Sequence, residues 1–215
     1  VDSSLIFSNA RKINKNIATE ISKNFLEVIL ARGFDNQSLE ILKRKKNLRI
    51  VDISNFKFKN LISIKSFDGS FLVQNKDNII LNKKKLKCVT KLKPDKKELA
   101  AIQFAFNVCK HVKSNAIVLC NNFSTIGIGA GQPSRLDSCK IAVQKAKQFQ
   151  ISKIKNSIAA SDAFFPFADG IDELIKAGVK TIIQPGGSIR DQEVINTANK
   201  AKIKMLFTGV RHFNH

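Results

Sequence analysis

The sequence predicts an α/β protein in which helices cover a mostly parallel or mixed β-sheet. Short apolar runs alternate with amphipathic segments along nearly all of the 215 residues, which is the pattern of strands interleaved with helices. The hydrophobic share of 43% is sufficient for a buried core, and the length corresponds to one or two domains.

The first half of the chain accounts for three strands and two helices of this pattern. We expect a strand at 4–8, a helix at 14–24, a strand at 25–31, a helix at 36–46 and a strand at 48–53. The Asp68-Gly69 pair is a turn signal in a segment that is harder to assign, where we expect two short strands at 71–74 and 78–81.

A long helix at about 93–112 opens the second half. Pro94 and Asp95 suit its first turn, and apolar residues repeat at helical spacing from Leu99 to Cys109. A boundary between two lobes is therefore expected near residues 91–94, which divides the chain into 1–92 and 93–215. The remaining predicted elements are strands at 116–120, 125–129, 157–160, 180–184 and 204–208, and helices at 135–149, 169–177 and 190–201.

The chain is strongly basic, with 37 lysine and arginine residues, 17 acidic residues and a formal net charge of +20. Such a charge is compatible with nucleic-acid binding. However, 30 of the 37 basic residues are lysine, and the accompanying richness in Ile, Asn and Phe is typical of proteins from AT-rich genomes. Because phosphate and base recognition favours the planar fork of arginine, we expect no nucleic-acid partner and instead a positive field that attracts small polyanionic substrates.

Cysteine and methionine usage indicates the compartment and the nature of the chain. Cys88, Cys109, Cys120 and Cys139 form no Cys-x-x-Cys pair, which argues against a zinc ribbon and predicts reduced, mostly buried thiols. The apolar runs are far shorter than the ~20 residues of a membrane-spanning helix, and no secretory signal is visible. We therefore expect a cytoplasmic protein without a membrane partner. We also expect a processed chain or a fragment, because its one methionine is Met205.

Three glycines follow an apolar run in the segment Ile126-Gly-Ile-Gly-Ala-Gly-Gln132. A dinucleotide-binding turn requires Gly-x-Gly-x-x-Gly between a strand and a helix, and here the third glycine comes one position early, so we exclude that site. Two interpretations stay open for these glycines: a purely structural role, or a narrow strand end at which a flat ligand approaches the backbone. Ser134 can cap the following helix, and Arg135 can clamp a phosphate or a carboxylate there.

Further polar and aromatic residues follow the predicted strands. Asn115 begins a strand, where its side-chain amide either forms a turn or contacts a heterocycle or carboxamide. The segment Ser161-Asp-Ala-Phe-Phe-Pro-Phe-Ala-Asp169 places three phenylalanines in a loop with no obvious core to fill, where they can stack on a heterocycle. Gln184-Pro-Gly-Gly-Ser-Ile-Arg-Asp191 and Arg211-His-Phe-Asn-His215 add glycines and charges. We therefore expect four strand ends to form one site at one edge of the sheet.

Together with Lys113-Ser-Asn-Ala-Ile-Val118, these segments resemble the formyltransferase domain of the bifunctional purine biosynthesis family. Phe25-Leu-Glu-Val-Ile-Leu-Ala31 and Ser70-Phe-Leu-Val-Gln-Asn-Lys-Asp77 match the family more loosely. The resemblance implies a cytidine deaminase-like α/β domain of two lobes without zinc, the first lobe truncated at its N-terminus. It also implies a homodimer with active sites at the interface.

The same resemblance implies a reaction and its participants. A formyl group would pass from the co-substrate 10-formyltetrahydrofolate to 5-aminoimidazole-4-carboxamide ribonucleotide (AICAR), and the parent protein would cyclise the product to inosine monophosphate (IMP). Asn115 would contact the carboxamide of AICAR or the formyl group in flight, and Arg135 and Phe164 would hold the ribotide. Asp169 would bind the pterin of the folate, and Arg211 would meet the nucleotide.

Other residues match the family less completely. Glu27 would correspond to a carboxylate that binds the ribose, and His215 is the family's usual terminal histidine, whose role stays open. The family's catalytic motif Lys-His-Ala-Asn-Pro-Cys-Gly does not occur in the 215 residues, and we interpret His111, which follows Lys110, as a helix-terminal residue. We therefore expect the chain alone to be nearly inactive. The alternative is a non-catalytic module that binds a nucleotide or a folate.

Overall fold

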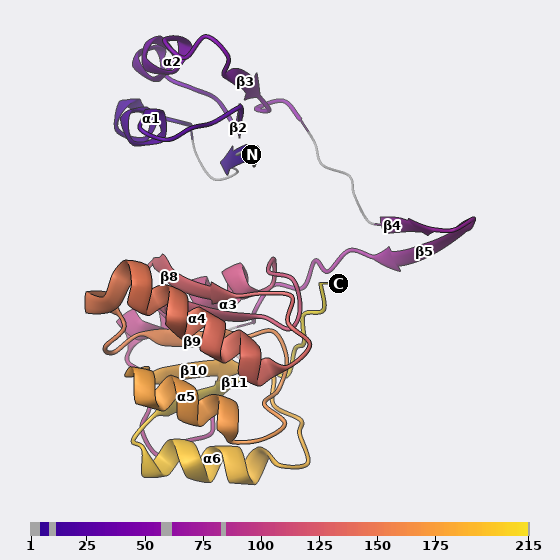
Figure 1. The fold of residues 1–215 in the computed structure, drawn as a ribbon, viewed down its shortest axis with the longest axis vertical. Coiled ribbons are helices and arrows are strands. Elements are labelled where there is room, and N and C mark those ends of the chain that lie inside the picture. The colour runs from indigo at the N-terminus through magenta and orange to yellow at the C-terminus, as the bar shows by residue number, and fades with distance from the viewer. Residues whose placement is uncertain (1–4, 9–11, 57–61, 83–84, 215) are drawn as a thin grey trace. The chain divides into compact units, whose positions relative to one another are not determined.

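The computed structural model describes residues 5–8, 12–56, 62–82 and 85–214 (Figure 1). The chain divides into two compact units, Val1–Lys76 and Asp77–His215. Each unit contains both helices and strands, which confirms the predicted α/β class.

The first unit contains a three-stranded parallel sheet and two helices. Its elements are β1 (Leu5–Ser8), α1 (Lys15–Ser22), β2 (Val28–Ala31), α2 (Asn36–Lys43) and β3 (Arg49–Asp52), and the strands lie in the order β1-β2-β3. Asn14 and Asp35 cap the helices, because their side chains accept hydrogen bonds from the N–H groups of Ile17 and Ser38. All five elements occur where the sequence predicts them, with ends that are shorter by a few residues.

A β-hairpin follows in the same unit. Its strands β4 (Ile62–Phe67) and β5 (Ser70–Asn75) pair around Asp68 and Gly69, whose φ angles are 30° and 78°. Two consecutive residues with positive φ are typical of the tight hairpin turn that favours Asp-Gly. The predicted strand at 71–74 is confirmed as β5, but the predicted partner strand at 78–81 was wrong. Asp68-Gly69 is the turn itself, so the partner of β5 precedes it, and residues 78–81 form no strand.

The second unit contains a six-stranded mixed sheet in the order β6-β11-β10-β9-β7-β8 (Figure 1). Strands β9, β10 and β11 are parallel, whereas β6 is antiparallel to β11, β7 to β9, and β8 to β7. The predicted helices and strands of this half are confirmed, but β6 and a 3₁₀ turn at Ile151–Lys153 are too short to give a periodic signal. In chain order the elements are β6 (Lys87–Cys88), α3 (Lys96–Cys109), β7 (Ile117–Asn121), β8 (Ser124–Gly129), α4 (Arg135–Gln150), β9 (Ile158–Ser161), α5 (Asp169–Ala177), β10 (Thr181–Gln184), α6 (Asp191–Lys200) and β11 (Lys204–Phe207).

Helices cover both faces of this sheet. On one face, buried residues of α3 such as Ile102 pack with Val118 and Ile183. On the other face, buried residues of α4, α5 and α6 pack with Ile117 and Ile182. Successive strand residues point to opposite faces, so neighbours such as Ile182 and Ile183 belong to opposite cores. The continuous apolar runs of these strands follow from burial on both sides.

Along the chain, the boundary between the two units lies between Lys76 and Asp77, whereas the sequence predicts a lobe boundary near residues 91–94. Residues 77–92 belong to the second unit by their contacts, because β6 pairs with β11 and places Cys88 opposite Leu206. Such a pairing joins residues more than a hundred positions apart, and sequence periodicity does not report it. The two-lobe division that the resemblance implies stays a prediction.

One edge of the six-stranded sheet gathers the segments that the sequence singled out. Because β7 is antiparallel to β9, its start lies beside the carboxyl end of β9, and Ile117 pairs with Ser161. Ile117 also pairs with Gly129 at the end of β8. The carboxyl ends of β10 and β11 lie at the same edge, because these strands are parallel to β9. The prediction that these strand ends share one edge is confirmed.

Candidate functional site

A cavity of about 530 Å³ lies at this edge of the second unit. The start of β7, the start of α4, the loop after β9 and the C-terminal segment all contribute to its lining. Five of the six residues that the sequence predicts for the site line this one cavity: Asn115, Arg135, Phe164, Asp169 and Arg211.

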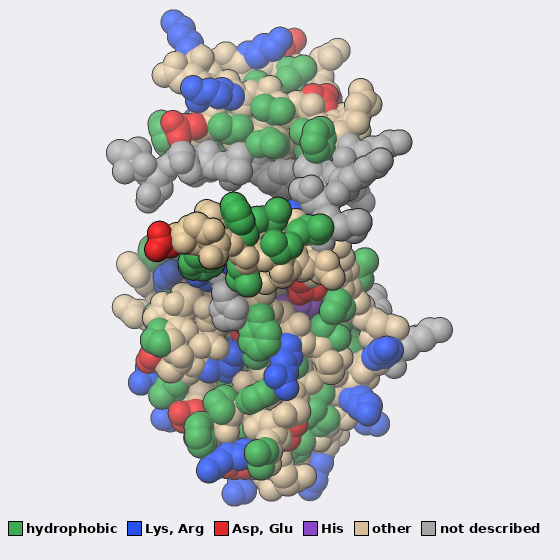
Figure 2. Space-filling view, turned by 90° about the vertical axis from the view of Figure 1, so that its right-hand side faces the viewer, with side chains coloured by type: hydrophobic (Ala, Val, Ile, Leu, Met, Phe, Trp, Pro, Cys, Tyr) green, Lys and Arg blue, Asp and Glu red, His purple; other side chains and the backbone are tan. Residues whose placement is uncertain are grey.

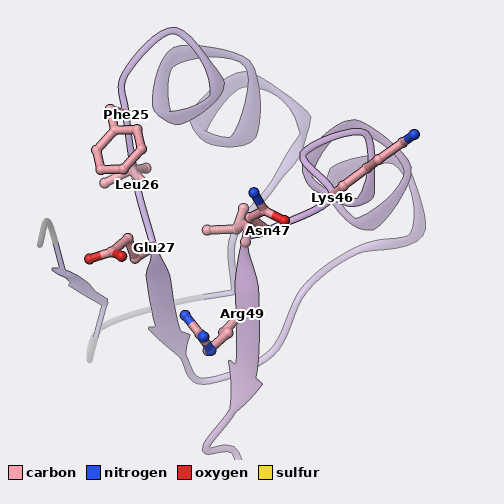
Figure 3. A pocket seen from close by; sticks show the side chains of 7 residues that line it. Phe25, Leu26, Glu27, Lys46, Asn47 and Arg49 are labelled. Atoms are coloured by element: carbon pink, nitrogen blue, oxygen red, sulfur yellow. The ribbon is translucent and has the colours of Figure 1, made fainter.

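Glu27, the sixth predicted residue, lies in the first unit. It directly precedes β2 and lines a different cavity of about 500 Å³, together with Phe25, Lys46 and Arg49 (Figure 3). This cavity lies at the amino ends of β2 and β3, whereas ligands of parallel sheets usually bind beyond the carboxyl ends. A role of Glu27 in ribose binding stays a prediction.

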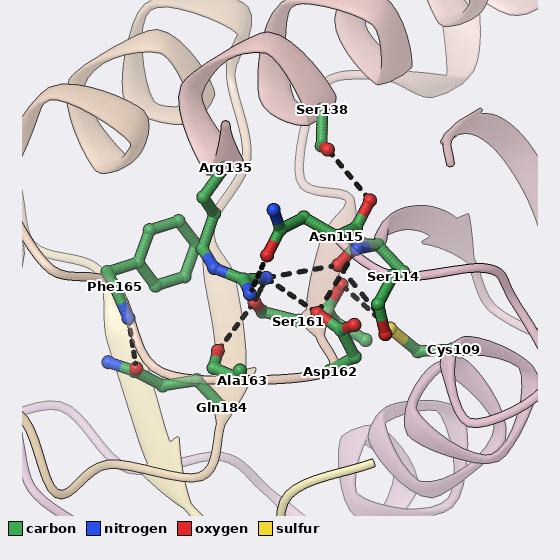
Figure 4. Close-up of polar contacts among 12 residues, drawn as sticks. Cys109, Ser114, Asn115, Arg135, Ser138, Ser161, Asp162, Ala163, Phe165 and Gln184 are labelled. Atoms are coloured by element: carbon green, nitrogen blue, oxygen red, sulfur yellow. Dashed lines mark hydrogen bonds and ion pairs between the residues drawn. The ribbon is translucent and has the colours of Figure 1, made fainter. Parts of the chain in front are cut away.

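Arg135, the first residue of α4, is buried and bonded within the protein (Figure 4). Its Nη1 donates to Oδ1 of Asp162 over 2.6 Å and to Oγ of Ser161 over 2.7 Å. Its Nη2 donates to Oδ1 of Asn115 over 2.8 Å. A guanidinium has five N–H donors, so three of these already have protein acceptors at short distance. The charge of Arg135 is paired with the buried carboxylate of Asp162, and the predicted role of this arginine as a clamp for a ligand stays a prediction.

The side-chain amide of Asn115 is held by three protein contacts. Its Oδ1 accepts from Arg135, and its Nδ2 donates to the backbone carbonyls of Gln132 and Pro133 over 2.9 Å and 3.2 Å. These contacts use both amide hydrogens and one lone pair of the oxygen. Besides these three contacts, the amide retains only an acceptor, the second lone pair of Oδ1.

Asp162, directly after β9, is fully buried. Besides Arg135, its Oδ1 accepts from the backbone N–H of Ala116 over 3.1 Å, and its carbonyl accepts from the N–H of His212 over 2.9 Å. The sequence did not assign a role to Asp162 or to Ser161. The signal was present, because a carboxylate that directly follows a short, mostly apolar strand requires a partner when it is buried.

The aromatic loop after β9 divides between core and cavity. Phe165 is buried in the core, and its N–H donates to Oε1 of Gln184 over 3.0 Å. The expectation that the loop's phenylalanines have no core to fill was therefore wrong for Phe165. Phe164 is half-buried and Phe167 is exposed, and both line the cavity. The guanidinium of Arg211 lies 4.9 Å from the ring centre of Phe164, a cation–π contact.

Two charged side chains at the cavity mouth are exposed to solvent. Arg211 is one of them, and Asp169, the first residue of α5, is the other. Oδ1 of Asp169 accepts from the N–H of Gly170 over 2.6 Å, so the carboxylate lies at the amino end of its helix, where a negative charge is favourable. We call Asn115, Arg135, Ser161 and Asp162 the inner cluster, and Phe164, Phe167, Asp169 and Arg211 the outer cluster.

The glycines of β8 make room for a helix. A Cβ atom at Gly127 would lie 2.1 Å from the carbonyl oxygen of Ala142, and one at Gly129 would lie 1.9 Å from that of Ser138. Both carbonyls belong to α4, the helix that begins with Arg135. Of the two interpretations that the sequence left open, the structural one therefore holds for these two glycines. Their small size brings α4, and with it Arg135, close to the sheet.

The C-terminal segment is fastened to the same edge of the sheet by His212. Its buried imidazole bonds through Nδ1 to a carboxylate oxygen of Asp77 and packs on the ring of Phe106, with ring centres 4.9 Å apart. Burial raises the pKa of Asp77, but the hydrogen bond to His212, the backbone N–H of Ile79 and the charge of Lys110 outweigh it, so this pKa is lowered. The fastening holds the residue next to Arg211 in place.

The other histidines and the cysteines have simpler surroundings. His111 is exposed just beyond the end of α3, which confirms that it is a helix-terminal residue, and His215 lies outside the described residues. All four cysteines are free, and three are buried. Burial raises the pKa of Cys109, and raises the pKa values of Cys120 and Cys139 to about 12. These three thiols stay protonated and unreactive near neutral pH.

Comparison with known proteins identifies the family. A sequence profile described as AICARFT/IMPCHase bienzyme matches residues 4–145, about two thirds of the chain. The chain belongs to this bienzyme family.

Curated members of the bienzyme family cover nearly the whole chain. The bifunctional purine biosynthesis protein PurH of Aquifex aeolicus is 46% identical over 204 residues, which are 95% of this chain and 39% of that protein. PurH of Leptospira biflexa is 46% identical over 205 residues, and PurH of Persephonella marina is 47% identical over 207 residues. In both cases the match covers 95% of this chain and 40% of the relative. The chain therefore spans about two fifths of the length of these relatives.

No helix in the described ranges combines the length and apolarity needed to cross a membrane. The same ranges contain no group of three or more His, Cys, Asp or Glu side chains that could hold a metal ion. On the face drawn in Figure 2, lysine and arginine side chains lie scattered among polar and apolar ones.

Proposed function

We propose that this chain forms part of an AICAR formyltransferase, within a bifunctional protein that also cyclises the product to IMP. The formyltransferase passes the formyl group of 10-formyltetrahydrofolate to the exocyclic amine of AICAR. The observation that carries the proposal is the meeting of Asn115, Arg135, Phe164, Asp169 and Arg211 in one cavity of about 530 Å³. This volume is in the range of small-molecule sites.

The ribotide fits the part of the cavity that lies between the two clusters. Oδ1 of Asn115 is an acceptor for an N–H of the carboxamide or of the amine. The half-buried ring of Phe164 offers a flat apolar surface to the imidazole. Arg211, whose guanidinium lies on that ring, supplies an exposed positive charge for the phosphate.

The folate fits the outer cluster. A pterin carries an amino group and ring N–H donors, and the exposed carboxylate of Asp169 accepts hydrogen bonds from such groups. The exposed ring of Phe167, which has the guanidinium of Arg190 4.6 Å from its centre, adds an aromatic surface beside it. Both substrates would therefore meet above the loop that follows β9.

Formyl transfer needs more than binding. The amine of AICAR is conjugated with its ring and is a poor nucleophile, so the reaction requires a base for the amine proton and stabilisation of the oxygen at the tetrahedral centre. Asn115 and Arg135 would orient the ribotide beside the formyl carbon. The motif Lys-His-Ala-Asn-Pro-Cys-Gly is absent from the 215 residues, and losing a base typically lowers a rate by ~10²–10⁴. We therefore propose that the chain by itself binds its substrates and turns over slowly.

The proposal also covers the domain type, the oligomeric state, the location and the cofactors. We infer a cytidine deaminase-like domain of two lobes, a homodimer with active sites at its interface and a cytoplasmic location. Folate enters as a co-substrate, and no metal takes part.

The test is a pair of measurements on the 215-residue chain. Calorimetric titration with AICAR should show saturable binding, and tetrahydrofolate release from 10-formyltetrahydrofolate should be slow or undetectable. A Lys200→Ala variant, which changes an exposed charge at the end of α6, should bind AICAR like the unsubstituted chain. Absence of AICAR binding would overturn the proposal, and rapid formyl transfer would show that the catalytic base lies within these residues.

A further inference from the structure

We propose that Asp162 is a positioning residue: its buried carboxylate fixes Arg135, and Arg135 in turn fixes the side-chain amide of Asn115. The inference rests on the proposed function, because it concerns the orientation in which Asn115 meets the substrate. Figure 4 shows the three side chains converging from the start of β7, the start of α4 and the end of β9.

The first step is the hold of Asp162 on Arg135. Oδ1 of Asp162 accepts from Nη1 of Arg135 over 2.6 Å and from the backbone N–H of Ala116 over 3.1 Å. Ala116 is the residue after Asn115. One carboxylate oxygen of Asp162 therefore holds the Arg135 guanidinium, which orients the side-chain amide of Asn115, and also the backbone next to that amide. Ser161 adds a second acceptor for Nη1 over 2.7 Å.

The second step concerns charge. The side chains of Arg135 and Asp162 are only 6% and 1% exposed. A guanidinium buried to this extent requires an ionised partner, and without one it would turn toward solvent or toward a ligand anion. Asp162 therefore keeps Arg135 in the protein wall, where Nη2 can point at Asn115.

The third step concerns the direction of the amide. Oxygen and nitrogen of an asparagine side chain can exchange places by a half-turn. Here the donor from Arg135 requires the oxygen on one side, and the carbonyls of Gln132 and Pro133 require the NH₂ group on the other. The ligand consequently meets an acceptor, which selects a substrate group that carries an N–H at this position.

The test separates charge from shape. Asp162→Asn keeps the side-chain volume and an oxygen at Oδ1 for both donors, and its NH₂ group replaces Oδ2, which has no hydrogen-bond partner among the described residues. In the ¹⁵N-labelled chain, the side-chain amide signals of Asn115, identified by their loss in Asn115→Ala, should shift and exchange with water at least tenfold faster. The isoleucine methyl signals of the core should stay in place. Asp169→Asn is the matched control, because it removes the same charge from an exposed site and should leave the Asn115 signals unchanged.

Two further measurements keep the outcome decisive. If the Asp162→Asn chain does not fold, the same experiment is done with Arg135→Lys. Lysine keeps the positive charge but lacks the planar guanidinium that donates to both Asp162 and Asn115, so the Asn115 signals should again shift. Asp162→Asn should also weaken AICAR binding at least tenfold. Asn115→Ala should weaken AICAR binding less in the Asp162→Asn chain than in the unsubstituted chain, because Asp162→Asn has already released the Asn115 amide. Unchanged Asn115 signals in the folded variants would overturn the positioning role. Absence of AICAR binding would overturn the proposed function, while the amide signals would still decide the role of Asp162.

Discussion

Asn115 and Arg135 of the inner cluster line the same cavity as the whole outer cluster, but the two clusters hold their charges in opposite ways. In the inner cluster, Arg135 and Asp162 are buried and pair with each other. In the outer cluster, Asp169 and Arg211 are exposed at the cavity mouth. A charged residue in a binding cavity is therefore not automatically a charge that the ligand meets. In the function that we propose, the inner cluster sets geometry, and Arg211 of the outer cluster supplies the positive charge that an anionic substrate meets.

The largest effect expected from this difference is on stability. Arg135→Ala should lower the free energy of unfolding of the second unit by roughly 3–5 kcal/mol, because it leaves Asp162 buried without a cation. Arg211→Ala, which removes the same side chain from the outer cluster, should change it by less than about 0.5 kcal/mol. Urea unfolding followed by circular dichroism measures both, and equal losses in the two variants would contradict the division into clusters.

Crowding the glycines of β8 should have the next largest effect. A methyl group at Gly129 meets a backbone carbonyl of α4, so Gly129→Ala should cost about 1–3 kcal/mol in urea unfolding. Because α4 begins with Arg135, the displaced helix should also weaken AICAR binding in calorimetry. Ser124→Ala, an exposed change on the same strand, is the control and should be silent in both measurements.

A third prediction concerns the fastening of the C-terminal segment. Asp77→Asn should destabilise the chain near neutral pH by roughly 1 kcal/mol, the typical value of one hydrogen bond. The pKa of Asp77 is lowered in the folded chain, so its contribution is present above the unfolded value of about 3.9 and is lost as pH falls through the folded value. Thermal unfolding of both chains from pH 7 to pH 3 should show a difference in Tm that is constant near neutral pH and narrows below about pH 4. A difference in Tm that does not change with pH would mean that the substitution acts through the shape of the side chain and not through its charge.

The smallest effect on stability is expected for Asp169→Asn. Its carboxylate is exposed, so the free energy of unfolding should change by less than about 0.5 kcal/mol. Folate binding should weaken about tenfold, the loss expected for one charge-assisted hydrogen bond. A fluorescence titration with a folate measures this, and equal affinity of the two chains would remove Asp169 from the folate site.

The sequence predicted most of the fold because its strands and helices carry strong periodic signals. The sequence predicts that Asn115, Arg135, Phe164 and Arg211 lie at one edge of the sheet, and all four line one cavity there. The hairpin was misplaced, since the Asp68-Gly69 turn was not recognised as the centre of its own strand pair.

Other features could not be read from the sequence because they depend on contacts between distant residues. The pairing of β6 with β11 and the bond between Asp77 and His212 each join residues over a hundred positions apart. The pairing of Arg135 with Asp162 likewise appears only in three dimensions, although it decides whether that arginine is free for a ligand. The sequence predicts a binding role for Arg135, and the fold shows that its guanidinium is buried and paired with Asp162.

The affinity of the Arg211→Ala variant for AICAR tests the division of labour between the clusters most directly. If Arg211 supplies the phosphate-binding charge, calorimetry should show an affinity at least tenfold weaker than that of the unsubstituted chain, with an unchanged free energy of unfolding. If instead Arg211→Ala binds AICAR as well as the unsubstituted chain does, the substrate's charge is met elsewhere, and the assignment of the outer cluster is wrong.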